Sequence, residues 1–208
     1  MKNLVIIGAG EFGQEFYSWC LASEGKDWII KGFLDDRTDC LEHSSLKHRI
    51  LSNISSYQPQ INDVFICAVG SGETRIKLSK ILQDKGGAFI NYIHSSVFIA
   101  SPFKMGVGNI LGPFVYGGIH ADMGNFNFFN VASSIGHHAK IGDGCTLNSH
   151  ADITGNVTLE NNVFLGSHAC IIPSKTVGQG AIIGAGSAVM RNVPAGATVV
   201  GVPAKRLI

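Results

Sequence analysis

The sequence predicts an α/β domain with a parallel sheet over residues 1–93, followed by an all-β parallel β-helix over residues 94–208. Two patterns carry this prediction. Large apolar residues recur at every sixth position in the second half of the chain, and a glycine-rich turn joins a buried strand to a helix near the start. A six-residue period matches neither the period of a helix, about 3.6 residues, nor the simple alternation of a strand.

The first elements of the chain are a strand, a turn and a helix. Residues 4–7 form a continuous apolar run, as expected for a strand buried on both faces. The run leads into a G-x-G-x-x-G turn at Gly8, Gly10 and Gly13, and a helix is predicted over residues 14–22. Such glycines let the backbone approach a ligand, and the amides at the helix start can receive a phosphate. The same glycines can also serve strand-to-helix packing alone, and the motif does not separate the two interpretations.

A second strand is predicted over residues 28–34, and it ends in Asp35 and Asp36. A carboxylate at this place can accept a hydrogen bond from a ribose hydroxyl. The elements expected after it are a strand over residues 64–69 closed by Gly70, a helix over residues 73–85 and a short strand over residues 88–93. This describes a Rossmann-like domain of three or four parallel strands. It is about half the size of a full dinucleotide-binding domain, so it suits a mononucleotide or nucleotide sugar better than NAD.

The six-residue pattern extends from residue 99 to residue 189. It has sixteen positions, and fifteen carry a large apolar residue, whereas a chain that is 45% apolar would fill about seven by chance. Most of these positions are followed, four residues later, by a small residue. The pattern is that of a β-helix with three faces to a coil of eighteen residues, in which each large residue stacks on its counterpart one coil later.

Breaks in the pattern predict the ends of the β-helix. Residues 94–102 are interpreted as a joint between the two domains. The chain after Val193 leaves the six-residue register, and prolines mark the place where it does so.

Composition limits the classes of partner. The net charge is +1 and no basic run is present, which excludes nucleic acid and anionic membranes as default partners. Five cysteines without C-x-x-C spacing indicate reduced thiols, and Cys145 is expected to pack inside. No apolar stretch approaches the length of a membrane-spanning helix, and the first residues lack a signal-peptide cleavage site. We therefore expect a cytoplasmic protein with no membrane contact.

Polar chemistry is expected at the corners of the β-helix, because aliphatic side chains fill its interior. His137 and His138 occupy one corner, and His120 precedes His138 by one coil of eighteen residues. His150 and His168 have the same spacing, so imidazoles of successive coils are expected to stack. A metal site is one interpretation, and histidines exposed at turns are the other. No carboxylate or cysteine completes a ligand set at matching offsets, so no metal is expected.

An imidazole at such a corner can take a proton from an attacking amine or hydroxyl at neutral pH. Asn130, Asn148 and Asn156 offer amide donors and acceptors on nearby turns, although asparagine is also an ordinary turn residue. Neither a Ser-His-Asp spacing nor a nucleophile elbow is present in the sequence. Acyl transfer at this corner would therefore pass directly from donor to acceptor.

The whole chain resembles the bacterial sugar acyltransferases with left-handed β-helices, a group that includes nucleotide-sugar N-acetyltransferases and sialic acid O-acetyltransferases. The matching segments are IIGAGEFGQE in the opening residues, GFLDD at 32–36, GSGETR at 70–75, FNVASSIGHHAKIGDG at 129–144, the six-residue repeats and the closing GVPAKRL. The resemblance implies a left-handed coil and a homotrimer. It also implies acetyl-CoA in the groove between neighbouring β-helices and a nucleotide-sugar substrate bound by the N-terminal domain.

The resemblance further assigns residues to the site. The catalytic base falls on His137, and its acidic partner falls on His138, which is a departure because a second imidazole orients the base only weakly. Asp152 is an alternative partner, and a second family histidine falls on Cys145 or Thr146. The implied substrate-binding residues are Gly8, Gly10, Gly13, Asp35, Asp36, Gly70 and Asn130. The implied cofactor-binding residues are Thr146, Gly155, Ser167, Gly184, Ala185 and Lys205.

The expected function is acetyl-CoA-dependent acetylation of the amino group of a nucleotide-linked 4-amino sugar for glycan biosynthesis, with His137 as general base. One alternative is O-acetylation of a sialic acid or another sugar hydroxyl, which makes greater demands on the base because a hydroxyl is the weaker nucleophile. Another is a non-catalytic β-helix protein that binds a sugar nucleotide. The sequence leaves open the nucleotide base, the sugar, the acylated position and the length of the acyl chain.

Overall fold

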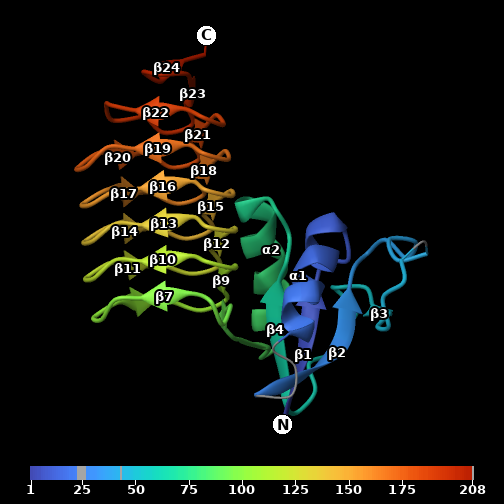
Figure 1. The fold of residues 1–208 in the computed structure, drawn as a ribbon. Coiled ribbons are helices and arrows are strands. Elements are labelled where there is room, and N and C mark those ends of the chain that lie inside the picture. Colours follow the sequence, from blue (N-terminus) through green and yellow to red (C-terminus); the bar gives the residue numbers. More distant parts are fainter. Residues whose placement is uncertain (23–26, 43, 208) are drawn as a thin grey trace. The chain divides into compact units, whose positions relative to one another are not determined.

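A computed structural model describes residues 1–22, 27–42 and 44–207. The chain divides into two compact units, Met1–Asn91 and Tyr92–Ile208 (Figure 1). The first unit is an α/β domain and the second is a parallel β-helix, so the predicted fold class is confirmed.

The N-terminal unit contains one sheet of five parallel strands in the order β3-β2-β1-β4-β5. Its strands are β1 (Lys2–Ile7), β2 (Trp28–Leu34), β3 (Ile50–Ser52), β4 (Asp63–Cys67) and β5 (Ala88–Phe89), and its helices are α1 (Glu11–Leu21) and α2 (Gly72–Gln83). The central strands β1 and β4 are almost wholly buried, as their apolar runs predict. The expected number of three or four strands was too low. Strand β3 has three residues and no apolar run, because it lies at the sheet edge and is only partly buried.

The prediction of one strand over residues 88–93 is wrong, because this segment contains two short strands that belong to different units. Strand β5 ends the first sheet at Phe89, while β6 (Tyr92–Ile93) pairs with β9 (Ile110–Leu111) of the β-helix. Residues 94–102 are therefore not a joint between domains. They belong to the first coil, which already contains β7 (Phe98–Ile99).

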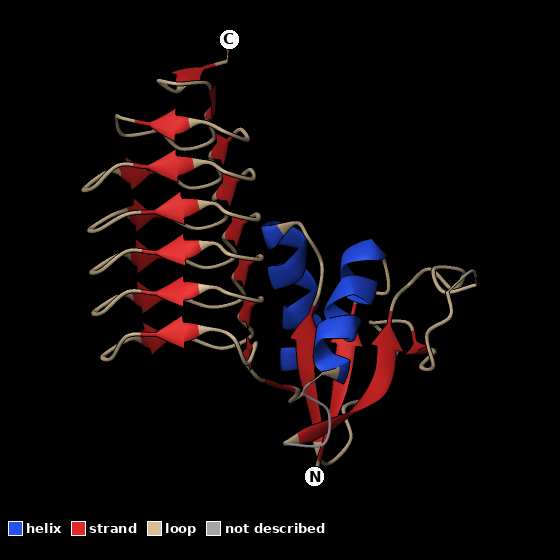
Figure 2. Ribbon diagram, in the orientation of Figure 1, coloured by secondary structure: helices blue, strands red, loops and turns tan. Residues whose placement is uncertain are grey.

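The β-helix has three faces, each a sheet of short strands stacked along the coil axis (Figure 2), and all of these strands pair in parallel except the last, β24. Face 1 consists of β7, β10 (Tyr116–Gly117), β13 (Ser134–Ile135), β16 (Asp152–Ile153), β19 (Cys170–Ile171) and β22 (Ala188–Val189). Face 2 consists of β8 (Lys104–Met105), β11 (Asp122–Met123), β14 (Lys140–Ile141), β17 (Thr158–Leu159) and β20 (Thr176–Val177). Face 3 consists of β6, β9, β12 (Phe128–Phe129), β15 (Thr146–Leu147), β18 (Phe164–Leu165), β21 (Ile182–Ile183), β23 (Thr198–Val200) and β24 (Lys205–Arg206). The coils wind in the left-handed sense (Figure 1).

The residues of the six-residue pattern fill the interior, as predicted. Ile135 pairs with Ile153, and Ile153 pairs with Ile171 one coil later, and all three side chains are fully buried. Gly117 is the one gap in the pattern, and the ring of Phe103 fills it, because a β-carbon on Gly117 would lie 3.0 Å from Cε2 of that ring. Each coil therefore buries its large side chains between the coils on either side, which is why a repeat unit of this kind is stable only in a stack.

Turns of four residues separate the faces. We call them corner 1 (between faces 1 and 2, for example residues 136–139), corner 2 (between faces 2 and 3) and corner 3 (between faces 3 and 1, for example residues 130–133). At corner 1, His120, His138 and Asn156 take the left-handed conformation with φ of 61°, 58° and 59°. Their backbone amides bond to the coil before, as when His138 N donates to Ile119 O at 2.9 Å. The backbone of each corner is thus fixed. At corner 1 the side chains of His137 and His138 are exposed, whereas that of Ala139 packs in the interior.

The C-terminal coil departs from the register, as predicted. Ile183 pairs with Val199, sixteen residues later, whereas earlier pairs lie eighteen residues apart. Strand β24 then runs antiparallel to β23. The shortened coil and the reversed strand end the repeat.

Candidate functional site

The N-terminal unit contains a cavity of about 530 Å³ at the carboxyl ends of β1 and β4. Ligands of open α/β sheets bind at this edge. The cavity is lined by Gly8, Gly10, Glu11, Phe12, Gly13, Gln14, Asp35, Arg37, Cys40, Ala68, Val69 and Gly70. Five of the predicted substrate-binding residues are thus brought together, and Asp36 is not among the lining residues.

The three glycines of the turn have different reasons to be glycine. A β-carbon on Gly13 would lie 2.1 Å from the carbonyl oxygen of Gly8, so Gly13 is required by helix packing. Gly8 has φ of +98° and would meet Ala68 O at 2.9 Å. Gly10 faces the cavity, where a β-carbon would meet only Nη2 of Arg37, at 3.2 Å. Packing therefore explains two glycines, and access to the cavity explains the third.

Helix α1 begins at the cavity, and no side chain caps its first turn. Gly10 is its N-cap residue and has no side chain to cap the first amides. Unsatisfied amides at a helix start carry partial positive charge and bind anions such as phosphate. Glu11 also lines the cavity, and its carboxylate would repel a phosphate bound there.

Arg37 also lines the cavity, where it pairs with Asp35, and it was not among the residues predicted from the sequence. Its Nε and backbone N donate to Oδ1 of Asp35 at 3.1 and 3.0 Å, and its Nη2 donates to Oδ2 at 3.1 Å. Ala9 N also donates to Oδ2, at 2.9 Å. Burial alone would raise the pKa of Asp35, but the bonds from Arg37 and Ala9 hold it below its ordinary value. With about four acceptor positions on a carboxylate, Asp35 has none left for a ribose hydroxyl unless Arg37 moves.

Arg75 was also missed, because an arginine on a helix ordinarily points to solvent. It is fully buried, and its Nη1 donates to Val69 O at 2.7 Å and to Gly70 O at 3.2 Å. Both of these residues line the cavity. A β-carbon on Gly70 would meet nothing within 4 Å. Arg75 therefore holds the loop after β4 in position, and the absence of a side chain at Gly70 leaves space in the cavity beside this loop.

Two predicted substrate-binding residues have structural partners away from this cavity. Oδ1 of Asp36 accepts a bond from Ile54 N at 3.0 Å. Asn130 lies at corner 3, where its Oδ1 accepts from Val131 N at 2.7 Å and its carbonyl oxygen accepts from the Ser133 hydroxyl at 2.8 Å. Both contacts fix turns of the chain.

In the β-helix, His137 lies exposed at corner 1 with its ring over Gly155 of the next coil. A β-carbon on Gly155 would stand 2.4 Å from Nε2 and 2.5 Å from Cε1 of the ring. Nδ1 of His137 lies 3.1 Å from Nδ1 of His138, and the two ring planes are at 85°. The other predicted partner, Asp152, accepts a bond from the Ser134 hydroxyl on face 1.

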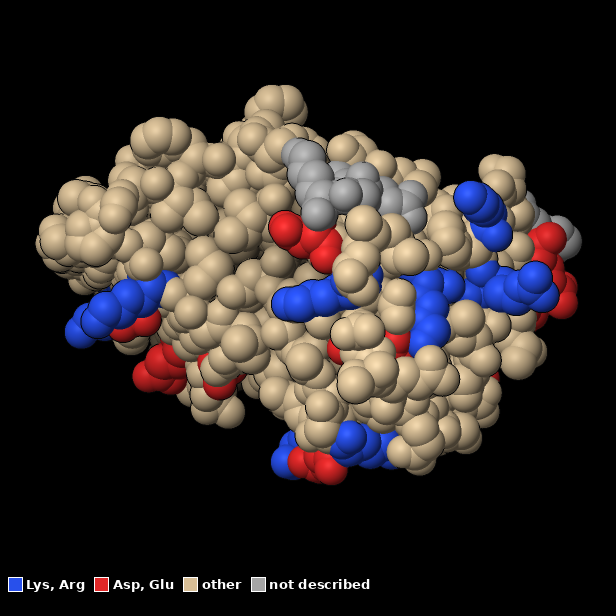
Figure 3. Space-filling model, turned by 90° about the horizontal axis from the view of Figure 1, so that it is seen from below, with Lys and Arg blue, Asp and Glu red and all other residues tan. Residues whose placement is uncertain are grey.

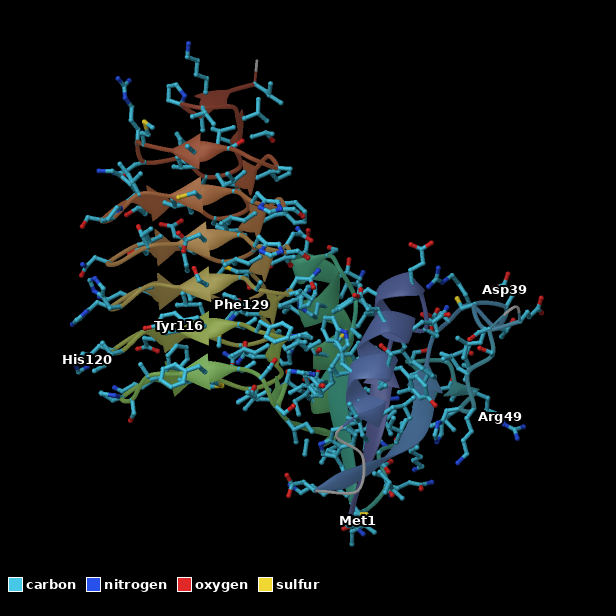
Figure 4. The ribbon with its side chains drawn as sticks, viewed as in Figure 1. Met1, Asp39, Arg49, Tyr116, His120 and Phe129 are labelled. Atoms are coloured by element: carbon cyan, nitrogen blue, oxygen red, sulfur yellow. The ribbon has the colours of Figure 1, made fainter. Side chains whose placement is uncertain are left out.

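The expected stacking of histidines in successive coils is confirmed. The rings of His120 and His138 lie 4.9 Å apart at corner 1, and those of His150 and His168 lie 4.7 Å apart and nearly parallel at corner 3. Figure 4 shows His120 at the outer edge of its coil. Within the described part of the chain, no three His, Cys, Asp or Glu side chains are arranged to hold a metal ion.

The predicted cofactor-binding residues are divided between different parts of one β-helix. Gly155 lies at corner 1 beside His137, whereas Ser167, Gly184 and Ala185 lie at corner 3. Thr146 is a buried residue of β15, and Lys205 is exposed on β24. A single β-helix therefore does not bring these six residues together.

None of the cysteines in the described structure forms a disulfide. Cys145 is fully buried, as predicted, and its Sγ donates to Glu160 O at 3.1 Å. Cys67 is also fully buried, and burial raises its pKa to about 12. Neither thiol is placed to attack a thioester, because the thiolate is the nucleophilic form and needs access to its substrate.

Basic and acidic side chains are interspersed on the face drawn in Figure 3, and much of that face carries neither. Among the helices of the described residues, none has the length and hydropathy to cross a bilayer.

Comparison with known proteins supports the resemblance drawn from the sequence. Residues 3–82 match the family model described as the PglD N-terminal domain. No curated protein matches the chain in sequence at a significant level. The acetyltransferase domain of PglB from Neisseria gonorrhoeae, solved with acetyl coenzyme A, is 24% identical with a TM-score of 0.88, and the match covers 99% of each chain.

Two further structures match over nearly the whole length. PerB from Caulobacter crescentus, solved with CoA and GDP-perosamine, is 25% identical with a TM-score of 0.90, and the match covers 100% of this chain and 98% of PerB. WeeI from Acinetobacter baumannii is 26% identical with a TM-score of 0.84, and the match covers 100% of both chains. The fold of the whole chain thus occurs in an acetyltransferase domain and in a protein whose structure holds CoA and GDP-perosamine.

Proposed function

We propose that the protein is an acetyl-CoA-dependent N-acetyltransferase acting on the amino group of a nucleotide-linked 4-amino sugar. The observation that carries the proposal is the full-length likeness to PerB, whose structure holds both CoA and GDP-perosamine. A cavity at the start of helix α1 in one unit and an exposed imidazole in the other supply the two kinds of site that this reaction needs.

The cavity of the N-terminal unit is the proposed nucleotide site. Its volume of about 530 Å³ is in the range of small-molecule sites, roughly 300–1,000 Å³. The first amides of α1 would receive a phosphate, with Gly10 and Gly70 leaving room for it. Arg37, whose Nη2 lies 3.2 Å from the place of a β-carbon on Gly10, would add a positive charge beside it.

His137 is the proposed general base. In the reaction, the sugar nitrogen forms a bond to the acetyl carbonyl carbon, and the bond from this carbon to the CoA sulfur breaks. Nε2 of His137 accepts the proton that the nitrogen loses, and the departing thiolate takes up a proton to become the CoA thiol. Transfer is direct, which is consistent with the burial of Cys145 and Cys67.

A homotrimer is the proposed assembly. Corners 1 and 3 are separate in one β-helix. If two copies packed with corner 1 of one against corner 3 of the other, the groove between them would be lined by both kinds of corner. Such a groove would bring Gly155 of one copy near Ser167 and Gly184 of the next, which is where the resemblance puts acetyl-CoA. Exposed aromatic side chains on face 1 also favour association, since Phe98 and Tyr116 stack at 6.0 Å and are 63% and 46% exposed. Sedimentation equilibrium would measure the assembly, and a monomer at micromolar concentration would contradict it.

A cytoplasmic location is proposed with the function. Acetyl-CoA and nucleotide sugars are cytoplasmic metabolites, and free cysteines are typical of that compartment.

The proposal is tested by incubating the protein with acetyl-CoA and a panel of nucleotide-linked amino sugars while thiol release is followed. Mass spectrometry of the products should find one added acetyl group that resists mild alkali, because an amide survives conditions that cleave an ester. An alkali-labile product would instead favour O-acetylation. Calorimetric binding of a nucleotide sugar with no binding of acetyl-CoA would favour the non-catalytic alternative and reject the transferase.

A further inference from the structure

Three imidazoles meet at corner 1, and His138 contacts the other two. Its Nδ1 lies 3.1 Å from Nδ1 of His137, within hydrogen-bond distance. Its ring centroid lies 4.9 Å from that of His120, with the planes tilted by 36°. Both His120 and His138 occupy the left-handed position of their turns, and their amides are bonded to Pro102 O at 2.6 Å and to Ile119 O at 2.9 Å. The backbone thus fixes the points from which the two rings project.

A hydrogen bond between two Nδ1 atoms has only two neutral forms. In the first, His137 donates from Nδ1, so its Nε2 carries a lone pair and His138 holds its proton on Nε2. In the second, His138 donates from Nδ1, and His137 holds its proton on Nε2. Only the first form leaves His137 with a free Nε2 that can accept a proton from a substrate. A carboxylate partner would always accept and would permit only the first form.

We propose that His138 and His120 are positioning residues that keep His137 in the tautomer with a bare Nε2. The proposal rests on the proposed function, in which His137 is the base. His138 supplies the acceptor for Nδ1–H of His137. His120 packs against the ring of His138 and limits its rotation, so that Nδ1 of His138 stays directed at His137. No resemblance assigned a role to His120, and the ring contact is what brings it into the site.

The test uses substitutions that separate accepting a hydrogen bond from filling space. His138→Ala removes the acceptor and should lower kcat about tenfold, the effect of one lost hydrogen bond, with KM for both substrates changed less than twofold. His138→Glu supplies an acceptor that cannot donate in its ionised form and should restore kcat to at least the wild-type value. His120→Ala should lower kcat, and His120→Phe, which keeps an aromatic ring, should retain more of it.

The matched control is His48→Ala, which removes an imidazole of the N-terminal unit that lies 2.8 Å from the Tyr17 hydroxyl. It should leave kcat unchanged, because His48 is not among the residues that line the cavity or that contact His137 or His138 in the described structure. A loss of kcat in this control equal to that in His120→Ala would overturn the role of His120.

Nitrogen-15 spectra of the imidazoles give a readout that does not depend on activity. In the free wild-type protein at neutral pH, the ring proton of His137 should be on Nδ1, and in His138→Ala it should be distributed between the two nitrogens. A proton held on Nε2 of His137 in the wild type, or equal kcat in wild type and His138→Ala, would overturn the proposal. If no nucleotide-linked amino sugar is acetylated by the wild type, the proposed function fails, and the spectra still decide the tautomer.

Discussion

The Nε2 atom of His137 lies 2.4 Å from the point that a β-carbon on Gly155 would occupy. The two residues are one coil apart at corner 1, so the ring of one coil rests on the backbone of the next. Any side chain at position 155 would take the place of the imidazole. The glycine is therefore a requirement of the position of His137, whatever its further role toward acetyl-CoA.

Gly155→Ala is expected to keep the fold and lose catalysis. The added methyl group meets a ring at the exposed end of a side chain, which can move, so the midpoint of thermal unfolding should change little. Displacing the base by about 1 Å should lower kcat by up to about 100-fold. Kinetic measurement and a thermal unfolding curve of the same preparation check both parts.

Gly136→Ala is the matched control at the same corner. Its β-carbon would lie 2.2 Å from the backbone carbon of Thr154, which cannot move aside, so this variant should lose stability. Equal unfolding midpoints for the two variants would contradict the distinction between a side-chain and a backbone contact.

The sequence was sufficient to predict the β-helix because every coil repeats one environment. Ile135, Ile153 and Ile171 stack on one another in equivalent buried positions. Equivalent positions require similar apolar residues, so the repeat is visible in the amino-acid sequence alone. The glycine turn was likewise visible, because Gly8 and Gly13 are dictated by close backbone contacts. Strand β3 left no such signal, since a short edge strand buries too little to impose a pattern.

The polar parts of the site were harder to predict because they depend on tertiary contacts. Arg37 and Asp35 are neighbours in sequence, but their bonding depends on how the chain turns after β2. From its helical sequence context alone, Arg75 would be predicted to lie on the surface. Its burial depends on its contacts with the loop of Val69 and Gly70, which only the tertiary structure shows. The roles assigned to the site residues from the resemblance stay predictions, and the following variants test several of them.

Arg37 and Glu11 should have opposite effects on nucleotide binding, because both line the cavity and only one attracts phosphate. Arg37→Ala should raise KM for the nucleotide sugar about tenfold, by loss of a charge-assisted hydrogen bond. Glu11→Gln should lower this KM a few-fold, by relief of repulsion. KM for acetyl-CoA should be unchanged in both.

Lys80→Ala controls for a general effect of lost positive charge. Lys80 is 70% exposed and pairs with Asp84 at 3.0 Å, and neither residue lines the cavity. If it raised KM for the nucleotide sugar as much as Arg37→Ala does, a local role of Arg37 would be rejected.

Arg75→Lys should impair substrate binding without unfolding the unit. Lysine retains the charge, but its ammonium is a point charge on a flexible stem and lacks the rigid planar guanidinium that places Nη1 of Arg75 at 2.7 and 3.2 Å from Val69 O and Gly70 O. The loop should lose its fixed position, so KM for the nucleotide sugar should rise several-fold. Initial-rate kinetics measure this, with Lys77→Ala as the control, since Lys77 is exposed on the same helix. Wild-type KM in Arg75→Lys would show that the loop holds its position without this arginine.

Asp63 should make the stability of the N-terminal unit depend on acid pH. Its buried carboxylate accepts bonds from Lys31 Nζ at 2.9 Å, Tyr57 OH at 2.7 Å and Gln60 N at 3.0 Å. Burial alone would raise its pKa, but the bonds from Lys31 and Tyr57 hold the pKa below the ordinary value. The stabilisation is therefore complete above the unfolded pKa of about 3.9 and is lost as the pH falls through the folded value.

Asp63→Asn should remove this dependence. At pH 7 the free energy of unfolding should fall by about 3 kcal/mol, because Lys31 loses its buried partner. As the pH falls below about 4, the wild type should lose stability that the variant no longer has. Both tryptophans, Trp19 and Trp28, lie in the N-terminal unit, so urea unfolding followed by tryptophan fluorescence reports on that unit alone. Asp84→Asn, at an exposed ion pair, is the control and should leave the urea midpoint unchanged. If the wild type and Asp63→Asn lost stability in parallel below pH 4, other carboxyl groups would determine the acid transition.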